Sequence, residues 1–189
     1  MTIMVGDMEF SDIHLFKSSS EIVEHAQAAR HKFPGGILLV PVDFSAHSAA
    51  ALVKASKFAQ LMSASLVVLH VVNDPAEMPG YYSGLIKKKQ TALIPQLAAE
   101  AFAAFMTSII EVHPSMDELT TASLMMVKGL PVTRILEVVE TLEPRMVIIG
   151  SQGRTGLENI VIGSKASQIV RLCPVPVTVV KHTEQNSPE

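Results

Sequence analysis

The sequence is poor in the residues that mark several large classes of protein. It has one cysteine and no tryptophan, and charged residues make up 17% of its 189 positions. A single cysteine excludes a framework of disulfides within the chain, which fits a reducing compartment better than a small secreted domain. That cysteine, Cys173, follows Leu172 and is predicted to be buried and unreactive.

Long basic tracts and long apolar runs are also missing. The formal net charge is -3 and the longest basic tract is Lys87 to Lys89, so nucleic acid is not an expected partner. The apolar runs within 37–42 and 65–72 fall well short of the roughly 20 residues that a membrane-spanning helix needs. The first ten residues carry Asp7 and Glu9 and do not resemble a secretory signal. We therefore expect a soluble, cytoplasmic protein with no membrane partner.

What is present is a high apolar content in a regular order. Hydrophobic residues make up 48% of the chain, enough for a sizeable core. Helical periodicity is expected at 48–62, about 85–112, 131–141 and 163–172, and Pro95 marks a start or a kink. Short apolar runs predict strands at 37–42, 65–72, 123–127, 146–150 and 176–180. Solid apolar strands alternating with helices predict a parallel sheet covered by helices on both faces, a three-layer α/β/α domain.

The first 33 residues follow a different pattern. Ser18 and Glu21 have the spacing of a capping box, which predicts one helix in this part of the chain. The "FPGG" stretch that starts at Phe33 then breaks the pattern. We predict an N-terminal extension with one helix at 1–33, the α/β domain at 34–183 and a disordered tail at 184–189.

A glycine-rich loop follows the predicted fourth strand. Gly150, Gly153, Gly156 and Gly163 stand close together, which is more than a simple turn requires. Their spacing fits neither the G-x-G-x-x-G dinucleotide fingerprint nor the G-x-x-x-x-G-K-[ST] P-loop. The chain is therefore predicted to be neither a Rossmann dehydrogenase nor a P-loop NTPase.

The physical elements of an anion site are nevertheless present in this loop. Gly163 and Ser164 stand where a helix begins, and bare amides and the helix dipole favour phosphate there. Lys165 and Arg154 would add positive charge, and Gly153 lets the loop come close. The alternative from the residues alone is a mobile loop in which Ser164 is an ordinary helix cap and Arg154 a solvated charge.

At this loop the chain resembles a known family. Gly150-x-x-Gly153, nine residues and then Gly163-Ser164 is similar to the G-2x-G-9x-G-[S/T] signature of ATP-binding universal stress proteins. The stretches "ILLVPVDFSAHSAAAL", "LVVLHVV", "VKGLPVTRILE" and "CPVPV" also resemble that family and occur in its order. The resemblance covers about residues 36–182 and leaves the N-terminal extension outside.

The resemblance implies a fold, a ligand and a set of contacts. The fold would be that of the adenine nucleotide alpha hydrolases, with five parallel strands in the order 3-2-1-4-5. The ligand would be ATP, or AMP or ADP, possibly with Mg²⁺ or Mn²⁺. The adenine and ribose would contact Pro41, Val42, Asp43, Val71, Val72 and Gly129, and the ribose and phosphates would contact Gly150, Gly153, Gly163, Ser164 and Lys165. Lys165 departs from the family, which often has a small apolar residue at this position.

Several of these residues also have a purely structural interpretation. Asp43 could instead cap the following helix, although an acid that ends a buried strand at the crevice favours a ligand role. Ser45 is expected to cap that helix, and Val71 and Val72 belong to a core strand in any case. Gly129 would serve as a simple turn. The seven histidines lack metal-ligand spacing, so His70 and the others are predicted to be structural or solvated, and no resident metal site is expected.

The function implied is a nucleotide-dependent switch or binding module in the stress response. No catalytic residue is nominated and at most slow ATP hydrolysis is expected, because no water-activating base is evident. The last strand, Val175 to Lys181, would be an exposed apolar edge unless paired, which favours a homodimer. One alternative is a domain of this family that binds no nucleotide and serves as an interaction module. A nucleotidyl transferase or ATP pyrophosphatase is less favoured, because the S-G-G-x-D-S and H-x-G-H motifs are absent.

Overall fold

The computed structural model describes residues 3–5, 8–10, 13–16, 21, 35–73, 94–153 and 162–182. The strands are β1 (Ile3–Val5), β2 (Met8–Phe10), β3 (Ile13–Phe16), β4 (Ile37–Val42), β5 (Ser65–Val72), β6 (Ser123–Lys128), β7 (Met146–Gly150) and β8 (Val177–Val180). The helices are α2 (Ala46–Met62), α5 (Ile94–Val112), α6 (Asp117–Thr120), α7 (Pro131–Leu142) and α8 (Ser164–Leu172).

From β4 onward the elements follow the predicted alternation of strands and helices. Pro95 lies in the first turn of α5 and therefore marks a start, not a kink. The expected part of this helix before Ile94 lies outside the described residues. The single turn of α6 between α5 and β6 was not predicted, because four residues are too few to show a helical period.

The main sheet has six strands in the order β3-β6-β5-β4-β7-β8. Every neighbouring pair in it is parallel. The five strands from β4 onward are therefore arranged as 3-2-1-4-5, which confirms the predicted topology. The chain runs outward from β4 through β5 to β6 and then returns through α7 to β7 on the other side of β4.

The sheet separates two cores, and β4 contributes to both. All six of its residues are buried. Leu38, Val40 and Val42 belong to the core under α2 and α5, whereas Ile37 and Leu39 belong to the core under α7 and α8. This alternation explains why a strand buried on both faces reads as a continuous apolar run.

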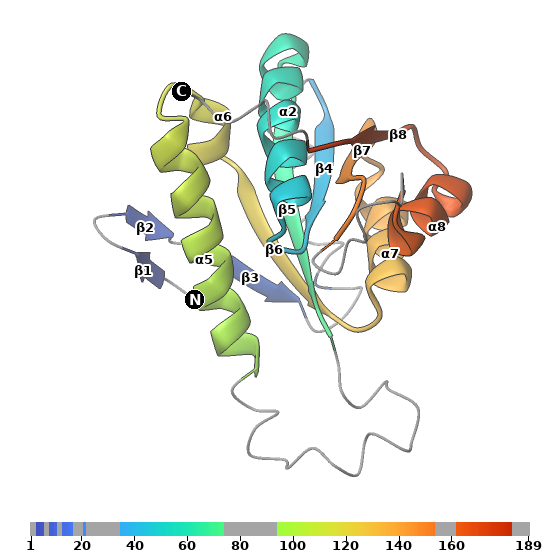
Figure 1. The fold of residues 1–189 in the computed structure, drawn as a ribbon, viewed down its shortest axis with the longest axis horizontal. Helices are drawn as coiled ribbons and strands as arrows, with labels where there is room; N and C mark the ends of the chain where they lie inside the picture. The colour runs from blue at the N-terminus through green and yellow to red at the C-terminus, as the bar shows by residue number, and fades with distance from the viewer. Residues whose placement is uncertain are drawn as a thin grey trace.

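The helices form layers on the two faces of the sheet (Figure 1), so the predicted three-layer architecture is confirmed. Small residues on α2, namely Ala51, Ala55 and Ala59, are fully or almost fully buried and let this helix lie close to the strands. On the opposite face, Ile135 and Val139 of α7 and Ile169 of α8 fill the second core. None of the helices in the described part of the chain is long and apolar enough to cross a membrane.

The described residues of the N-terminal extension form three strands that were not predicted. β1 and β2 form an antiparallel pair beside α5 (Figure 1), while β3 joins the main sheet next to β6. The expectation of a helix alone in this extension was therefore incomplete. Of the expected helix, only Glu21 is described as helical, and the residues after it lie outside the described part. The predicted tail at 184–189 also lies outside it.

Candidate functional site

The carboxyl edge of the sheet has its switch point between β4 and β7. From β4 the chain continues to β5 on one side, and β7 is added later on the other side. The paired residues of β4 and β7 end at Leu39 and Val147, whereas β4 stays paired with β5 up to Val42. Pro41, buried in β4, has no N–H to donate. Such a point in an open parallel sheet is the usual place for a ligand.

Asp43 follows β4 directly and lies at this switch point. Its Oδ1 accepts the hydroxyl of Ser45 at 2.6 Å and the amide of Ser45 at 3.2 Å. The Ser45 hydroxyl oxygen in turn accepts the amide of Ser48 at 3.2 Å and so caps α2. The predicted capping role thus belongs to Ser45, and the contacts with Ser45 orient the Asp43 carboxylate through Oδ1.

The other oxygen of Asp43 faces the glycine loop. A Cβ placed on Gly153 would lie 2.6 Å from Asp43 Oδ2, closer than real Cβ contacts allow. Residues 110 positions apart in the chain are therefore adjacent, and only glycine fits at Gly153 without movement. The structure thus brings Asp43 and the second signature glycine together.

The loop returns to the sheet at the beginning of α8. The Gly163 amide donates to the Ser151 carbonyl at 2.7 Å, which fixes the start of the helix beside the end of β7. Gly163 is the N-cap residue, and no side chain of the described residues caps this end of the helix. Ser164 is thus the first helical residue and not the cap, and both it and Lys165 are exposed. Arg154 lies outside the described residues.

An uncapped helix start of this kind suits an anionic ligand. The first amides of a helix have no carbonyl partner within the helix, and the helix dipole places partial positive charge there. A Cβ on Gly163 would lie 3.5 Å from its nearest neighbour, an ordinary contact, and the φ of Gly163 is -66°. Neither the described neighbours nor the backbone conformation therefore requires glycine at this position.

Gly150 has a different role from the one expected. A Cβ on Gly150 would lie 2.7 to 2.9 Å from backbone atoms of His47 and Ser48 in the first turn of α2. The space beside this glycine is thus filled by the protein and not by a ligand. Gly150 serves the close packing of α2 on β7, although it stands in the family signature.

The remaining predicted residues lie along the same edge, at the ends of β5 and β6. Val72 is buried, Val71 is half-buried, and the Val72 carbonyl accepts the amide of Gly129 at 2.9 Å. Gly129 has a φ of 140°, a conformation that side chains with a Cβ rarely adopt. These residues thus lie at the carboxyl ends of β5 and β6, and the backbone conformation at Gly129 requires glycine.

Sequence reasoning missed an aromatic cluster formed by the residue after Asp43 and by side chains of β5 and α5. Phe44 stacks on His70 with ring centroids 4.1 Å apart, and Phe102 and Phe105 lie on α5 beside Phe44. The signals were a phenylalanine directly after the acidic residue and a histidine inside an otherwise apolar strand. Neither signal shows that the two rings meet, because they belong to different parts of the chain.

The described residues contain no group of three or more His, Cys, Asp and Glu side chains that could hold a metal ion.

His47 and His182 meet edge to face with ring centroids 5.7 Å apart, which links the start of α2 to the residues after β8. Cys173, the C-cap residue of α8, is a free thiol and is only partly buried, so the prediction that it is buried was wrong. Its position at a helix end, and not in a core strand, explains the exposure.

Comparison with known proteins places this geometry in a family. A sequence model of the universal stress protein family matches residues 36–181. The "Universal stress protein MJ0531" of Methanocaldococcus jannaschii is 38% identical over 56 residues, which are 30% of this chain and 33% of that protein. The alignment with this relative thus spans a third of its length.

Solved structures show the same fold. The universal stress protein UspA from Lactobacillus plantarum aligns with a TM-score of 0.54 and 24% identity, over 77% of this chain and 97% of that one. A structure described as a putative universal stress protein from Pseudomonas aeruginosa aligns with a TM-score of 0.55 and 23% identity, over 78% of this chain and 48% of that one. Because the family model spans most of the sequence and the fold agrees, the chain belongs to the universal stress protein family.

Proposed function

We propose that this protein binds ATP, or AMP or ADP, at the carboxyl ends of β4 and β7 and acts as a nucleotide-dependent switch or binding module in the stress response. The observation that carries the proposal is the meeting of Asp43 Oδ2 with Gly153 beside the uncapped start of α8. A carboxylate suits ribose hydroxyls, and bare helix amides suit phosphate.

The residues at the site fit the two ends of a nucleotide. Asp43 would accept hydrogen bonds from ribose hydroxyls, while Ser164, Lys165 and the first amides of α8 would hold the phosphates. A divalent ion would arrive with the phosphates as Mg²⁺ or Mn²⁺, since the described residues form no metal cluster of their own. A bound nucleotide would add negative charge and order to the carboxyl edge of the sheet. The protein residues at this site would position the nucleotide, and they support binding without efficient hydrolysis.

Calorimetric titration of ATP with Mg²⁺ into the full chain tests the proposal. We expect Gly153→Val to abolish binding, because the new side chain would meet Asp43 Oδ2. Lys165→Ala should weaken binding about three- to tenfold through loss of a charge-assisted contact. Lys57→Ala is the matched control, since Lys57 is an exposed lysine in the second half of α2.

The outcomes separate the proposal from its alternative. If millimolar ATP neither binds the wild-type chain nor raises its Tm, the nucleotide site is refuted and a role as an interaction module takes its place. If ATP binds but Gly153→Val binds equally well, nucleotide is held elsewhere and this site assignment is wrong.

We also propose a homodimer formed through β8. This strand is at the edge of the sheet, and all four of its residues are only half-buried. Val170 and Leu172 of the neighbouring α8 are 45% and 59% exposed. An apolar edge strand beside exposed apolar side chains is a surface that pairing with a second copy would cover.

A further inference from the structure

The backbone directly after Asp43 is in a strained conformation. Phe44 has a φ of 65°, in the left-handed region that glycine occupies readily and bulky residues avoid. Residues in this region persist only where their surroundings hold them. Phe44 is one of three described non-glycine residues with positive φ, and the other two, Ser63 and Glu143, end helices. Phe44 instead stands between the carboxylate of the candidate site and the cap of α2.

The ring of Phe44 is held by contacts with three neighbouring rings. It stacks on the imidazole of His70 with centroids 4.1 Å apart and planes 22° apart. On its other sides lie Phe105 at 5.3 Å and Phe102 at 5.8 Å, centroid to centroid. These separations are those of favourable aromatic pairs, and Phe102 is fully buried. The aromatic contacts thus offset the unfavourable backbone conformation.

His70 also holds the residue on the other side of Asp43. Its Nδ1 lies 2.9 Å from the carbonyl oxygen of Val42. Because a carbonyl oxygen can only accept, Nδ1 must carry a proton and donate it. One imidazole therefore contacts Val42 through a hydrogen bond and Phe44 through stacking, and Asp43 is the residue between them.

We propose that the ring of His70, acting through Val42 and Phe44, positions the Asp43 carboxylate for the nucleotide ribose. This role rests on the proposed nucleotide binding. Ser45 holds Oδ1 of Asp43, and Oδ2 faces Gly153, so a rotation of the backbone at Phe44 would turn Oδ2 away from the glycine loop. His70 is thus a positioning residue and touches no ligand itself.

The first experiment reads the hydrogen bond in the full-length wild-type protein without nucleotide. Long-range ¹H–¹⁵N NMR of the histidine rings distinguishes the two neutral tautomers. We expect His70 to carry its proton on Nδ1, because only that tautomer donates to Val42. A neutral ring protonated on Nε2 would overturn the proposal, whether or not the protein binds ATP.

The second experiment measures ATP affinity in a double-mutant cycle. His70→Phe keeps a stacking ring and removes the donor, and we expect it to weaken ATP binding about five- to tenfold. His70→Asn keeps a donor on the short side chain and should recover part of that loss. In an Asp43→Asn background, His70→Phe should cause no further loss, because its effect passes through the carboxylate.

His113→Phe is the matched control, since His113 follows the far end of α5. It should leave ATP affinity unchanged in both backgrounds. If the role of His70 is merely structural, His70→Phe should lower Tm and ATP affinity by the same amount in the wild-type and in the Asp43→Asn background. That additive result would refute the positioning role and leave the nucleotide site unaffected. If wild type binds no ATP, the proposed function fails, and the NMR tautomer still decides the contact.

Discussion

At the scale of single residues, the signature glycines serve unlike purposes. Gly150 gives α2 room against β7, Gly153 gives room to the Asp43 carboxylate, and a Cβ on Gly163 would make only ordinary contacts. The three positions are equivalent in the sequence motif, but neighbouring protein atoms require glycine at the first two and not at the third. Substitution should therefore separate a loss of folding from a loss of binding.

We expect Gly150→Ala to destabilise the fold by about 2 kcal/mol, because its Cβ would press on the backbone of His47 and Ser48. Gly163→Ala should change the free energy of unfolding by less than about 0.5 kcal/mol, since its Cβ meets only ordinary contacts. Urea denaturation followed by circular dichroism measures both. Equal stability of the two variants would contradict this division between packing and binding.

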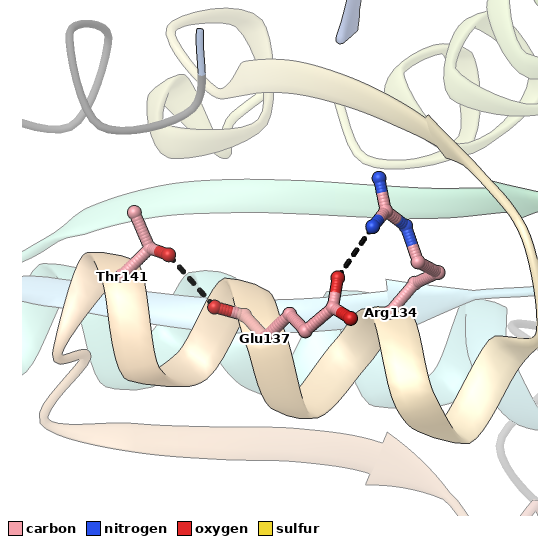
Figure 2. Close-up of polar contacts among 3 residues, drawn as sticks. All are labelled: Arg134, Glu137 and Thr141. Carbon is pink, nitrogen blue, oxygen red and sulfur yellow. Dashed lines mark hydrogen bonds and ion pairs between the residues drawn. The ribbon is translucent and has the colours of Figure 1, made fainter. Parts of the chain in front are cut away.

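At the scale of elements, α7 carries a mostly buried charge that the sequence did not single out. Arg134, 17% exposed, donates from Nη1 to the Glu137 carboxylate one turn later (Figure 2). Its Nε is buried and has no hydrogen-bond partner among the residues that the structure describes. The Thr141 hydroxyl donates to the Glu137 carbonyl at 2.8 Å on the same helix (Figure 2). A buried ion pair with one unsatisfied donor contributes little to the free energy of unfolding. Removing the Glu137 carboxylate alone would nevertheless leave the Arg134 charge buried without its partner, which is unfavourable.

We expect Glu137→Ala to destabilise the protein by about 1 kcal/mol, because it leaves the Arg134 guanidinium without its carboxylate. Arg134→Met should be neutral or stabilising, since it removes the buried charge and fills similar volume. Glu140→Ala, an exposed glutamate on the same helix, is the control and should change little. Thermal unfolding measures all three, and an equal loss for Glu137→Ala and Arg134→Met would count against this explanation.

At the scale of the whole molecule, the two edges of the sheet differ, because the extension adds a strand at one edge and not at the other. The family model begins at residue 36, and the extension before it places β3 along β6 with Phe16 opposite Val127. Phe16 is 6% exposed and belongs to the core under α7 and α8. The extension thus completes one edge of the sheet, while β8 remains the edge strand on the other side.

Phe16→Ala should lower the free energy of unfolding by about 3 kcal/mol if β3 is part of the cooperative core. Leu61→Ala is the control, because Leu61 is 82% exposed. Hydrogen exchange of the β6 amides should also speed up in the Phe16 variant, as its neighbouring strand loosens. A variant as stable as wild type would show that the extension folds apart from the domain.

Val179→Pro should convert the proposed dimer to a monomer. The Pro176 and Val180 carbonyls accept amides of β7 and of the residue after it, so by the alternation of a parallel ladder the Val179 amide points away from β7. Proline there removes a donor that a second copy would use and leaves the β7 ladder intact. Light scattering on a sizing column measures the mass, with Val179→Thr as the β-branched control. A dimeric Val179→Pro variant would place the interface elsewhere.

Much of the domain could be predicted because its information is local. A strand buried on both faces, such as Ile37–Val42, is recognisable from its own residues, and so is the spacing from Gly150 to Gly163. The strands of the extension could not be predicted, because three or four residues show no reliable period.

The sequence by itself determined the family, the order of strands and helices, and the glycine loop, because each depends on residues adjacent in the chain. The tertiary structure decided which glycine serves packing, that Phe44 is strained, and that His70 contacts Val42 from 28 residues away. These facts depend on which side chains meet after the strands have paired, and no local pattern records that meeting.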